Sequence, residues 1–134
     1  MSGIAARAAV VAVAVLVLAW LGFMERGVRL QASGTAAAQR LDVPGNANRA
    51  EQAFRDARLL TPDAGPDLQR AFLLRATERH DEAIALLEDV VQREPENLTA
   101  WGVLATFARG RDADAVARAH AARERLDPLS VRSR

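Results

Sequence analysis

The fold is decided by residues 62–95, which read PDAGPDLQRAFLLRATERHDEAIALLEDVVQREP. The stretch begins and ends with proline, and a third proline follows at the same spacing, so that Pro62, Pro95 and Pro128 recur every 33 residues. Proline cannot continue a helix and pushes the residue before it out of the helical region. Two amphipathic helical patterns fit within each interval. A period of this length therefore predicts stacked helical hairpins.

Five amphipathic segments are predicted to be helices, because apolar residues recur in them every three or four positions. They cover residues 46–60, 66–80, 81–94, 97–110 and 113–127. We expect Asn46 or Asn48, Asp81, Asn97 and Asp112 to be N-caps, and Gly110 to be a left-handed cap. The alternation with a period of two that indicates strands is missing. The predicted fold class is all-α.

Two segments of the chain resemble the tetratricopeptide repeat family. The pattern Ala50-x3-Phe54-x2-Ala57-x4-Pro62 is similar to the signature of the second helix of that repeat. Trp101-x2-Leu104-Ala105 looks like the signature of its first helix, with Ala105 where the family prefers glycine. The resemblance covers about residues 46–128, which is two helix pairs and a preceding second helix. The period of 33 instead of 34 and the weak last helix make the array degenerate.

The resemblance implies a TPR-like solenoid that binds other proteins. In that family, an extended peptide or a partner helix usually lies in a concave groove lined by the first helix of each pair. Carried over to this sequence, the resemblance assigns the following positions to partner binding: Gln69, Leu73, Thr99, Thr106 and Arg109.

The amino-terminal segment predicts a membrane anchor. Residues 8–24 read AAVVAVAVLVLAWLGFM and contain no charge, and residues 4–24 would form a helix of about 31 Å, enough to cross a hydrocarbon core of about 30 Å. The competing interpretation is a cleaved signal peptide, but the first small-x-small site, Ala36 to Ala38, follows late. A short tail before one early span is typical of a signal anchor, which favours an extracytoplasmic soluble domain.

The predicted organisation has four parts. Residues 1–26 form the transmembrane anchor, 27–45 a juxtamembrane linker or weak helix, 46–129 the repeat domain and 130–134 a tail. The polar, alanine-rich segment 25–40 has two interpretations: it either extends the anchor helix or forms a poor helix that stacks on the next one.

Candidate chemistry is sparse. The formal net charge is +1 with interspersed charges, so we expect no nucleic-acid partner, and the absence of cysteine excludes disulfides and thiolate sites. His80 and His120 have no second ligand one helical turn away, and Asp112 and Asp114 would point apart on a helix. We therefore predict no enzyme, no catalytic residue, no metal or other cofactor, and no small-molecule substrate.

Two functions agree with these features. The leading prediction is a membrane-anchored scaffold that binds a peptide or protein partner. The alternative is a structural accessory subunit whose transmembrane helix docks in a larger membrane complex, with the repeats packed beside it.

Overall fold

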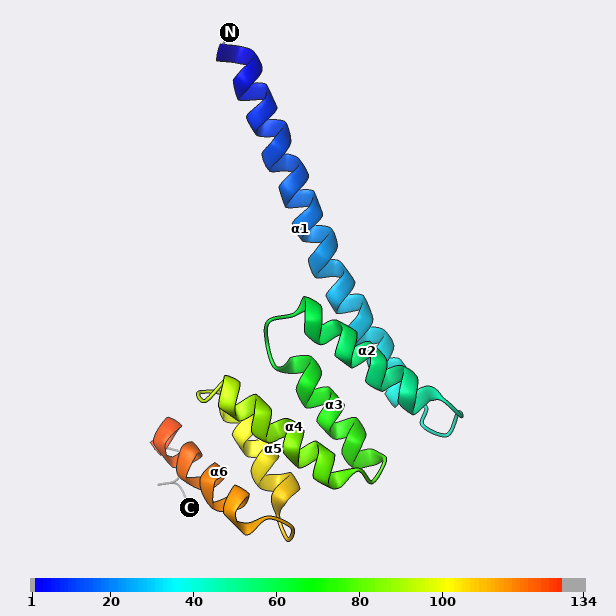
Figure 1. Cartoon of the computed structure of the whole chain (residues 1–134), viewed down its shortest axis with the longest axis vertical. Coiled ribbons are helices and arrows are strands. Elements are labelled where there is room, and N and C mark those ends of the chain that lie inside the picture. Colours follow the sequence, from blue (N-terminus) through cyan, green and yellow to red (C-terminus); the bar gives the residue numbers. More distant parts are fainter. Residues whose placement is uncertain (1, 129–134) are drawn as a thin grey trace.

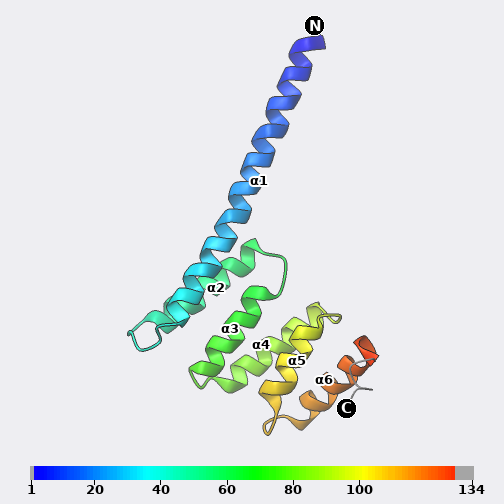
Figure 2. The same ribbon diagram turned by 180° about the vertical axis from the view of Figure 1, so that it is seen from behind.

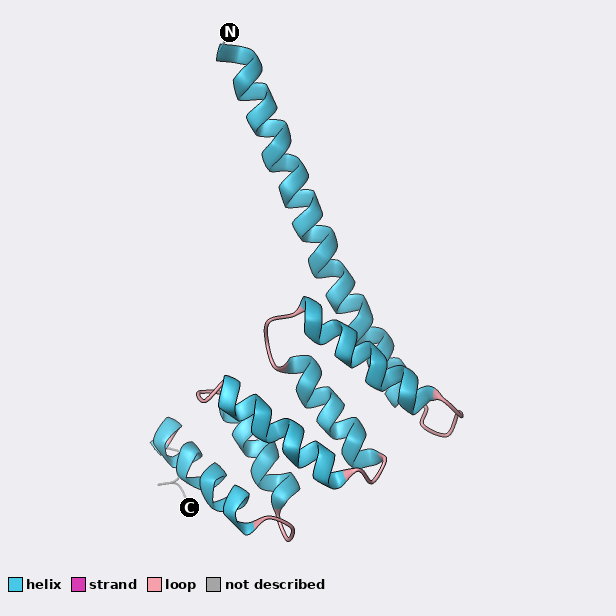
Figure 3. Ribbon diagram, viewed as in Figure 1, coloured by secondary structure: helices cyan, strands magenta, loops and turns pink. Residues whose placement is uncertain are grey.

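The structure is a computed structural model that describes the backbone of residues 2–128 and the side chains of residues 13–22 and 25–128. The described chain is all-α and contains no strand (Figure 3). Its six helices are α1 (Ser2–Ala38), α2 (Asn46–Leu60), α3 (Gly65–Ala76), α4 (His80–Arg93), α5 (Leu98–Ala108) and α6 (Ala113–Leu126). Consecutive helices run antiparallel and stack as hairpins, and the N-terminal part of α1 projects away from the stack (Figure 1).

The helices form three hairpins, one more than the sequence resemblance indicated. The C-terminal part of α1 packs along α2 and supplies the first helix of the first pair (Figure 2). Ala37 of α1 is buried in one cluster with Ala50, Phe54 and Leu73. Residues 25–38 therefore satisfy both interpretations of this segment, since they continue the amino-terminal helix and also stack on the next one.

Gly34 sets the close approach of α1 and α2. A Cβ atom added at Gly34 would lie 2.6 Å from Cε1 of Phe54, a separation that real Cβ atoms essentially never show. Phe54 is only 2% exposed and its ring cannot swing out to make room. Gly34 is thus the place where the ring of Phe54 meets the α1 backbone.

The predicted transmembrane span is not confirmed. Within the part of the chain that the structure describes, no helix is long and apolar enough to cross a membrane. The prediction covers residues 8–24, and the side chains of residues 8–12, 23 and 24 lie outside the described ones. The tail at residues 130–134 also lies outside the described residues.

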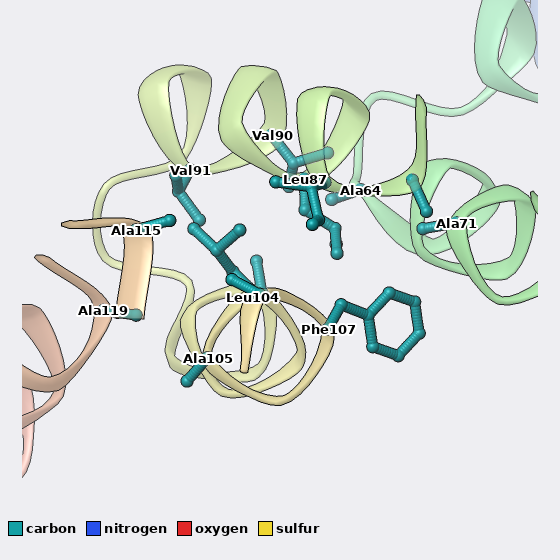
Figure 4. Packing of buried hydrophobic residues seen from close by; sticks show 14 of the residues in the cluster. Ala64, Ala71, Leu87, Val90, Val91, Leu104, Ala105, Phe107, Ala115 and Ala119 are labelled. Atoms are coloured by element: carbon teal, nitrogen blue, oxygen red, sulfur yellow. The ribbon is translucent and has the colours of Figure 1, made fainter. Parts of the chain in front are cut away.

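The main core lies between α3, α4, α5 and α6, where leucine and valine side chains meet alanine on the facing helices (Figure 4). Leu74, Leu87 and Leu104 are at most 1% exposed. Small residues line the facing surfaces and let the helices approach: Ala71, Ala83, Ala100, Ala108, Ala115 and Ala119, each fully buried. Alternation of large and small side chains is what antiparallel helix packing requires.

The predicted helix ends are only partly confirmed. Asn97 accepts a hydrogen bond from the Ala100 amide (2.9 Å), Asp112 accepts one from the Ala115 amide (2.8 Å), and Gly110 has a φ of 78°. The prediction that Asp81 is an N-cap is wrong, because α4 begins at His80 and Asp81 lies in its first turn. The prediction for Asn46 and Asn48 is also wrong: Gly45 precedes α2 with a φ of 82° and no side chain caps the helix.

The helix predicted over residues 66–80 ends early, at Ala76. Glu78 adopts a φ of 62°, a left-handed conformation uncommon for a residue other than glycine, and the amides of Thr77, Glu78 and Arg79 close the helix end by bonding to α3 carbonyls. The sequence has no glycine here, so this stop had no local signal.

Two glycine substitutions should have opposite effects on stability. Gly34→Ala should lower the free energy of unfolding by about 1–3 kcal/mol, because the added methyl group overpacks against Phe54. Gly102→Ala, in α5 with nothing within 4 Å of the added atom, should raise it by about 1 kcal/mol through helix propensity. Chemical denaturation of the full chain measures both. Equal effects of the two substitutions would contradict the α1–α2 packing.

Overpacking should also be costly at Ala83, which is fully buried on α4. We expect Ala83→Leu to destabilise the chain by about 1–3 kcal/mol. Ala85→Leu is the matched control, since Ala85 is exposed on the same helix and a leucine there should change little. The melting temperatures of the two variants measure the difference. An unchanged melting temperature for Ala83→Leu would show that the proposed register of the repeats is incorrect.

Candidate partner-binding groove

An apolar groove of about 280 Å³ lies where α1, α2 and α3 meet. It is lined by Thr35, Ala38, Leu41, Phe54, Gln69, Phe72, Leu73 and Ala76. None of these side chains carries a charge, and only Thr35 and Gln69 offer polar atoms. A cleft that is mostly apolar with few polar groups is suited to binding an apolar side chain of a ligand.

The groove has a rigid floor and a more exposed rim. Phe54 (2% exposed) and Leu73 (4% exposed) belong to the buried cluster between the first two hairpins and form the floor. Phe72 (53% exposed) and Leu41 (37% exposed) stand at the rim. Exposed apolar groups at the rim of a prebuilt cleft would lose water on binding, which favours association with an apolar partner.

Two polar side chains meet inside the groove. The Thr35 hydroxyl donates to the Gln31 carbonyl (3.0 Å), and its oxygen lies 3.5 Å from Oε1 of Gln69. The Nε2 amide group of Gln69 has no hydrogen-bond partner among the described residues. It can donate to a backbone carbonyl of a bound segment, which would fix the register of that segment in the groove.

Of the five positions that the family resemblance assigned to partner binding, Gln69 and Leu73 line the groove. Leu73 is also a core residue, so truncating it would disturb the fold as well as the surface. The other three lie on α5 or at its end, outside the groove lining, and all are exposed: Thr99, Thr106 and Arg109. The Thr106 hydroxyl donates to the Gly102 carbonyl (2.9 Å).

An aromatic and cationic contact connects the groove with α5. The ring of Phe72 meets that of Phe107 edge to face with centroids 5.1 Å apart, and Cζ of Arg75 lies 4.5 Å from the Phe107 centroid. Such contacts stabilise by about 0.5–1.5 kcal/mol for the ring pair. The period of 33 aligns Phe72 with Ala105, and this alignment gives no sign of the place of Phe72 at the rim.

Behind the groove, one carboxylate connects α2, α3 and α4. Glu51 of α2 accepts hydrogen bonds from Arg55 (2.6 Å), Arg70 of α3 (3.1 Å) and Arg79, the N-cap of α4 (2.6 Å). The side chain of Glu51 is 10% exposed, so these interactions are partly shielded from solvent. The Glu51 cluster thereby fixes the orientation of the helices that carry the groove floor.

A second carboxylate repeats this arrangement one helix further along. Asp67, in the first turn of α3, accepts from Arg58 of α2 (2.9 Å) and Arg93 of α4 (2.6 Å). The hydrogen bond to Asp67 raises the pKa of Arg93, although burial alone would lower it. Asp67 thus links three helices, and its negative charge also lies in the first turn of α3, where the helix dipole favours it.

The pKa of Glu51 reflects the balance between burial and these hydrogen bonds. Burial raises the pKa of Glu51, but the hydrogen bonds from Arg79, Arg55 and Arg70 together lower it below its ordinary value of 4.5. Arg79 also holds the pKa of Glu82 low. A carboxylate whose pKa is lowered on folding stabilises the fold above its unfolded pKa, and this stabilisation is lost as the pH falls through its folded pKa.

Within the described residues, no group of three or more histidine and acidic side chains is placed to hold a metal ion. An open depression between α4 and α6 is lined by Asp81, Glu88, Arg111, Asp112 and Asp114 together with apolar residues. Arg111 approaches Asp81 at 3.9 Å, and Asp112 is occupied as a helix cap.

The stacked antiparallel hairpins with small residues at their contacts define a helical repeat protein of the solenoid class. A family model described as tetratricopeptide repeat matches residues 65–107, which is α3, α4 and most of α5. The matched segment and the stacked helices around it fit a tetratricopeptide-like repeat protein, as the sequence patterns predicted. No curated protein and no solved structure gave a match.

Replacing Glu51 by glutamine should weaken the fold in a pH-dependent way. At neutral pH, Glu51→Gln should lower the free energy of unfolding by about 1–3 kcal/mol, since hydrogen bonds to a charged acceptor are lost. The difference from the unmodified chain should shrink as the pH falls from 4.5 through the lower pKa of Glu51 in the folded chain, because the carboxylate is protonated first in the unfolded chain and last in the folded one. Urea denaturation across this range measures the effect. A difference that does not change with pH would contradict the assigned role of the Glu51 charge.

Proposed function

We propose that the protein is a membrane-attached scaffold that binds a segment of a protein partner in the groove between α1, α2 and α3. The class of function follows from the tetratricopeptide repeat, since such repeats generally bind protein or peptide partners. The observation that carries the proposal is the groove itself, with its apolar floor and half-exposed Phe72. The bound segment would insert one large apolar side chain and accept a hydrogen bond from Gln69. Thr99, Thr106 and Arg109 would extend the binding surface along α5.

Membrane attachment is supported by the sequence of residues 8–24, which contains no charge and is long enough to span in a helical conformation. Large apolar side chains of α1 in this stretch are also exposed, among them Leu16 (69%), Leu18 (68%) and Trp20 (60%). The proposal keeps the repeats on the extracytoplasmic side, the orientation that the sequence analysis favoured. A protein that holds a partner in this way needs no catalytic group.

Filling the groove should abolish binding without unfolding the protein. Ala76 lines the groove and its side chain is exposed, so Ala76→Trp would occupy the space that the ligand needs. We expect peptides selected from a random library on the detergent-solubilised full chain to contain a large apolar residue. Their affinity for Ala76→Trp should fall at least about tenfold, which corresponds to about 1.4 kcal/mol.

The matched control is Ala117→Trp, which adds the same side chain to an exposed position on α6. This variant should bind the selected peptides as the unmodified chain does. Circular dichroism would verify that both variants keep their helices. Peptides that bind Ala76→Trp unchanged would rule out the groove as the binding site.

The docking-subunit alternative makes a different prediction. If the amino-terminal helix itself recognises the partner, exchanging residues 8–24 for an unrelated apolar span should abolish co-purification from native membranes, while Ala76→Trp should leave it intact. The scaffold proposal expects the reverse outcome.

A further inference from the structure

The C-terminal end of α2 presents the most exposed large apolar side chain among the described residues. Leu59 is 81% exposed and belongs to neither buried cluster. Its neighbours differ, since Ala57 is fully buried and Leu60 is half-buried. A single exposed leucine is common on protein surfaces. Leu59 differs from such scattered residues in its position relative to α1.

Leu59 lies beside the point where α1 leaves the repeat domain. A Cβ atom added at Gly27 of α1 would be 3.6 Å from Cβ of Leu60 and 3.1 Å from Oγ1 of Thr61, and one added at Gly65 would be 3.5 Å from Nε2 of Gln31. The turn between α2 and α3 is therefore held against residues 27–31 of α1. Figure 1 shows that this turn is the part of the repeat domain nearest to the projecting portion of α1.

The apolar run of the sequence ends close to the same level. Met24 precedes Gly27 by three residues, a rise of about 4.5 Å along a helix. The charged residues that follow the run are exposed: Glu25, Arg26 and Arg29. Charged side chains directly after an apolar span lie at the headgroup level of a membrane. Because Leu60 lies at the height of Gly27, its exposed neighbour Leu59 would then reach the same layer from the repeat domain.

We infer that the end of α2 around Leu59 contacts the surface of a phospholipid bilayer, with the leucine inserted at the boundary between headgroups and acyl chains. The inference rests on the proposed membrane attachment and adds a second contact to it, made by the repeat domain. An apolar side chain at this boundary is stabilised by the area that it removes from water.

The orientation needed for this contact is built into the fold. Because α1 is one helix from Ser2 to Ala38 and packs on α2 through Gly34, the direction of the amino-terminal helix fixes which surface of the repeats faces the bilayer. Two of the nearby arginines are paired, Arg29 with Glu25 (2.5 Å) and Arg58 with Asp67 (2.9 Å), while the exposed Arg26 adds a positive charge beside the apolar run. The leucine itself makes an apolar contact, which does not depend on the charge of the lipid.

Single cysteine labels test the inference directly, because the chain has no cysteine. Leu59→Cys, Leu16→Cys and Val43→Cys would each carry an environment-sensitive NBD fluorophore on the full chain in phosphatidylcholine vesicles. Position 16 reports insertion of α1. Val43 is 43% exposed and precedes α2, so the length of α2, about 20 Å, separates this control from Leu59.

The measurement is loss of NBD emission when some of the lipid carries a doxyl quencher, placed near the headgroup end of the acyl chain for positions 59 and 43 and near its methyl end for position 16. We expect quenching at positions 16 and 59 and none at 43. Quenching at 16 without quenching at 59 would overturn the inference and leave membrane attachment intact. Absence of quenching at both 16 and 59 would overturn the membrane attachment and the inference together. Equal quenching at 59 and 43 would indicate nonspecific adhesion of the repeat domain and would also overturn the inference.

Discussion

The contact between the Gly34 backbone and the ring of Phe54 is the interaction on which the rest of this structure depends. It lets α1 approach α2 closely enough to become the first helix of a hairpin. The same contact leaves Phe54 at the bottom of the groove, with Thr35 and Ala38 of α1 as one wall. A larger residue at position 34 would separate the helices and remove that wall, so the packing that completes the first repeat also creates the candidate site.

The charged clusters behind the groove explain how so small a fold holds its shape. Glu51 and Asp67 each join side chains from three consecutive helical segments, and both lie on the side of α2 and α3 that faces α4. Partly buried carboxylates with several arginine donors restrict helix orientation more than an apolar contact of the same size, because the geometry of each hydrogen bond is directional. These hydrogen bonds hold α2 and α3 in place, and they keep the groove open in the absence of a ligand.

The repeat architecture was predictable because its signals are local. Each of the regularly spaced prolines ends a helix beside it, and Asn97 and Asp112 cap helices through amides three residues further on. The small residues Ala50 and Ala83 recur with the same period of 33 and are both buried. The first helix of the array was left open between two interpretations, because its alanine-rich sequence acquires its role only against α2. The rim position of Phe72 depends on Phe107 and Arg75, which are distant in sequence, and no local pattern reveals such a contact.

Because α1 is one continuous helix, its projecting part and its packed part are mechanically coupled. Residues 27–38 of α1 form a wall of the first hairpin, while its apolar N-terminal part projects from the domain. Sharp kinks in helices occur mostly at proline, at pairs of glycine and serine, or where the hydrogen-bond ladder is interrupted. Residues 4–32 of α1 contain neither proline nor serine, and the Ser33–Gly34 pair lies in the part that packs on α2. Tilting the projecting part therefore applies a torque to the wall that carries Thr35 and Ala38. In a membrane-attached scaffold, the orientation of the anchor and the width of the groove would be coupled through the Gly34 contact, without any hinge between them.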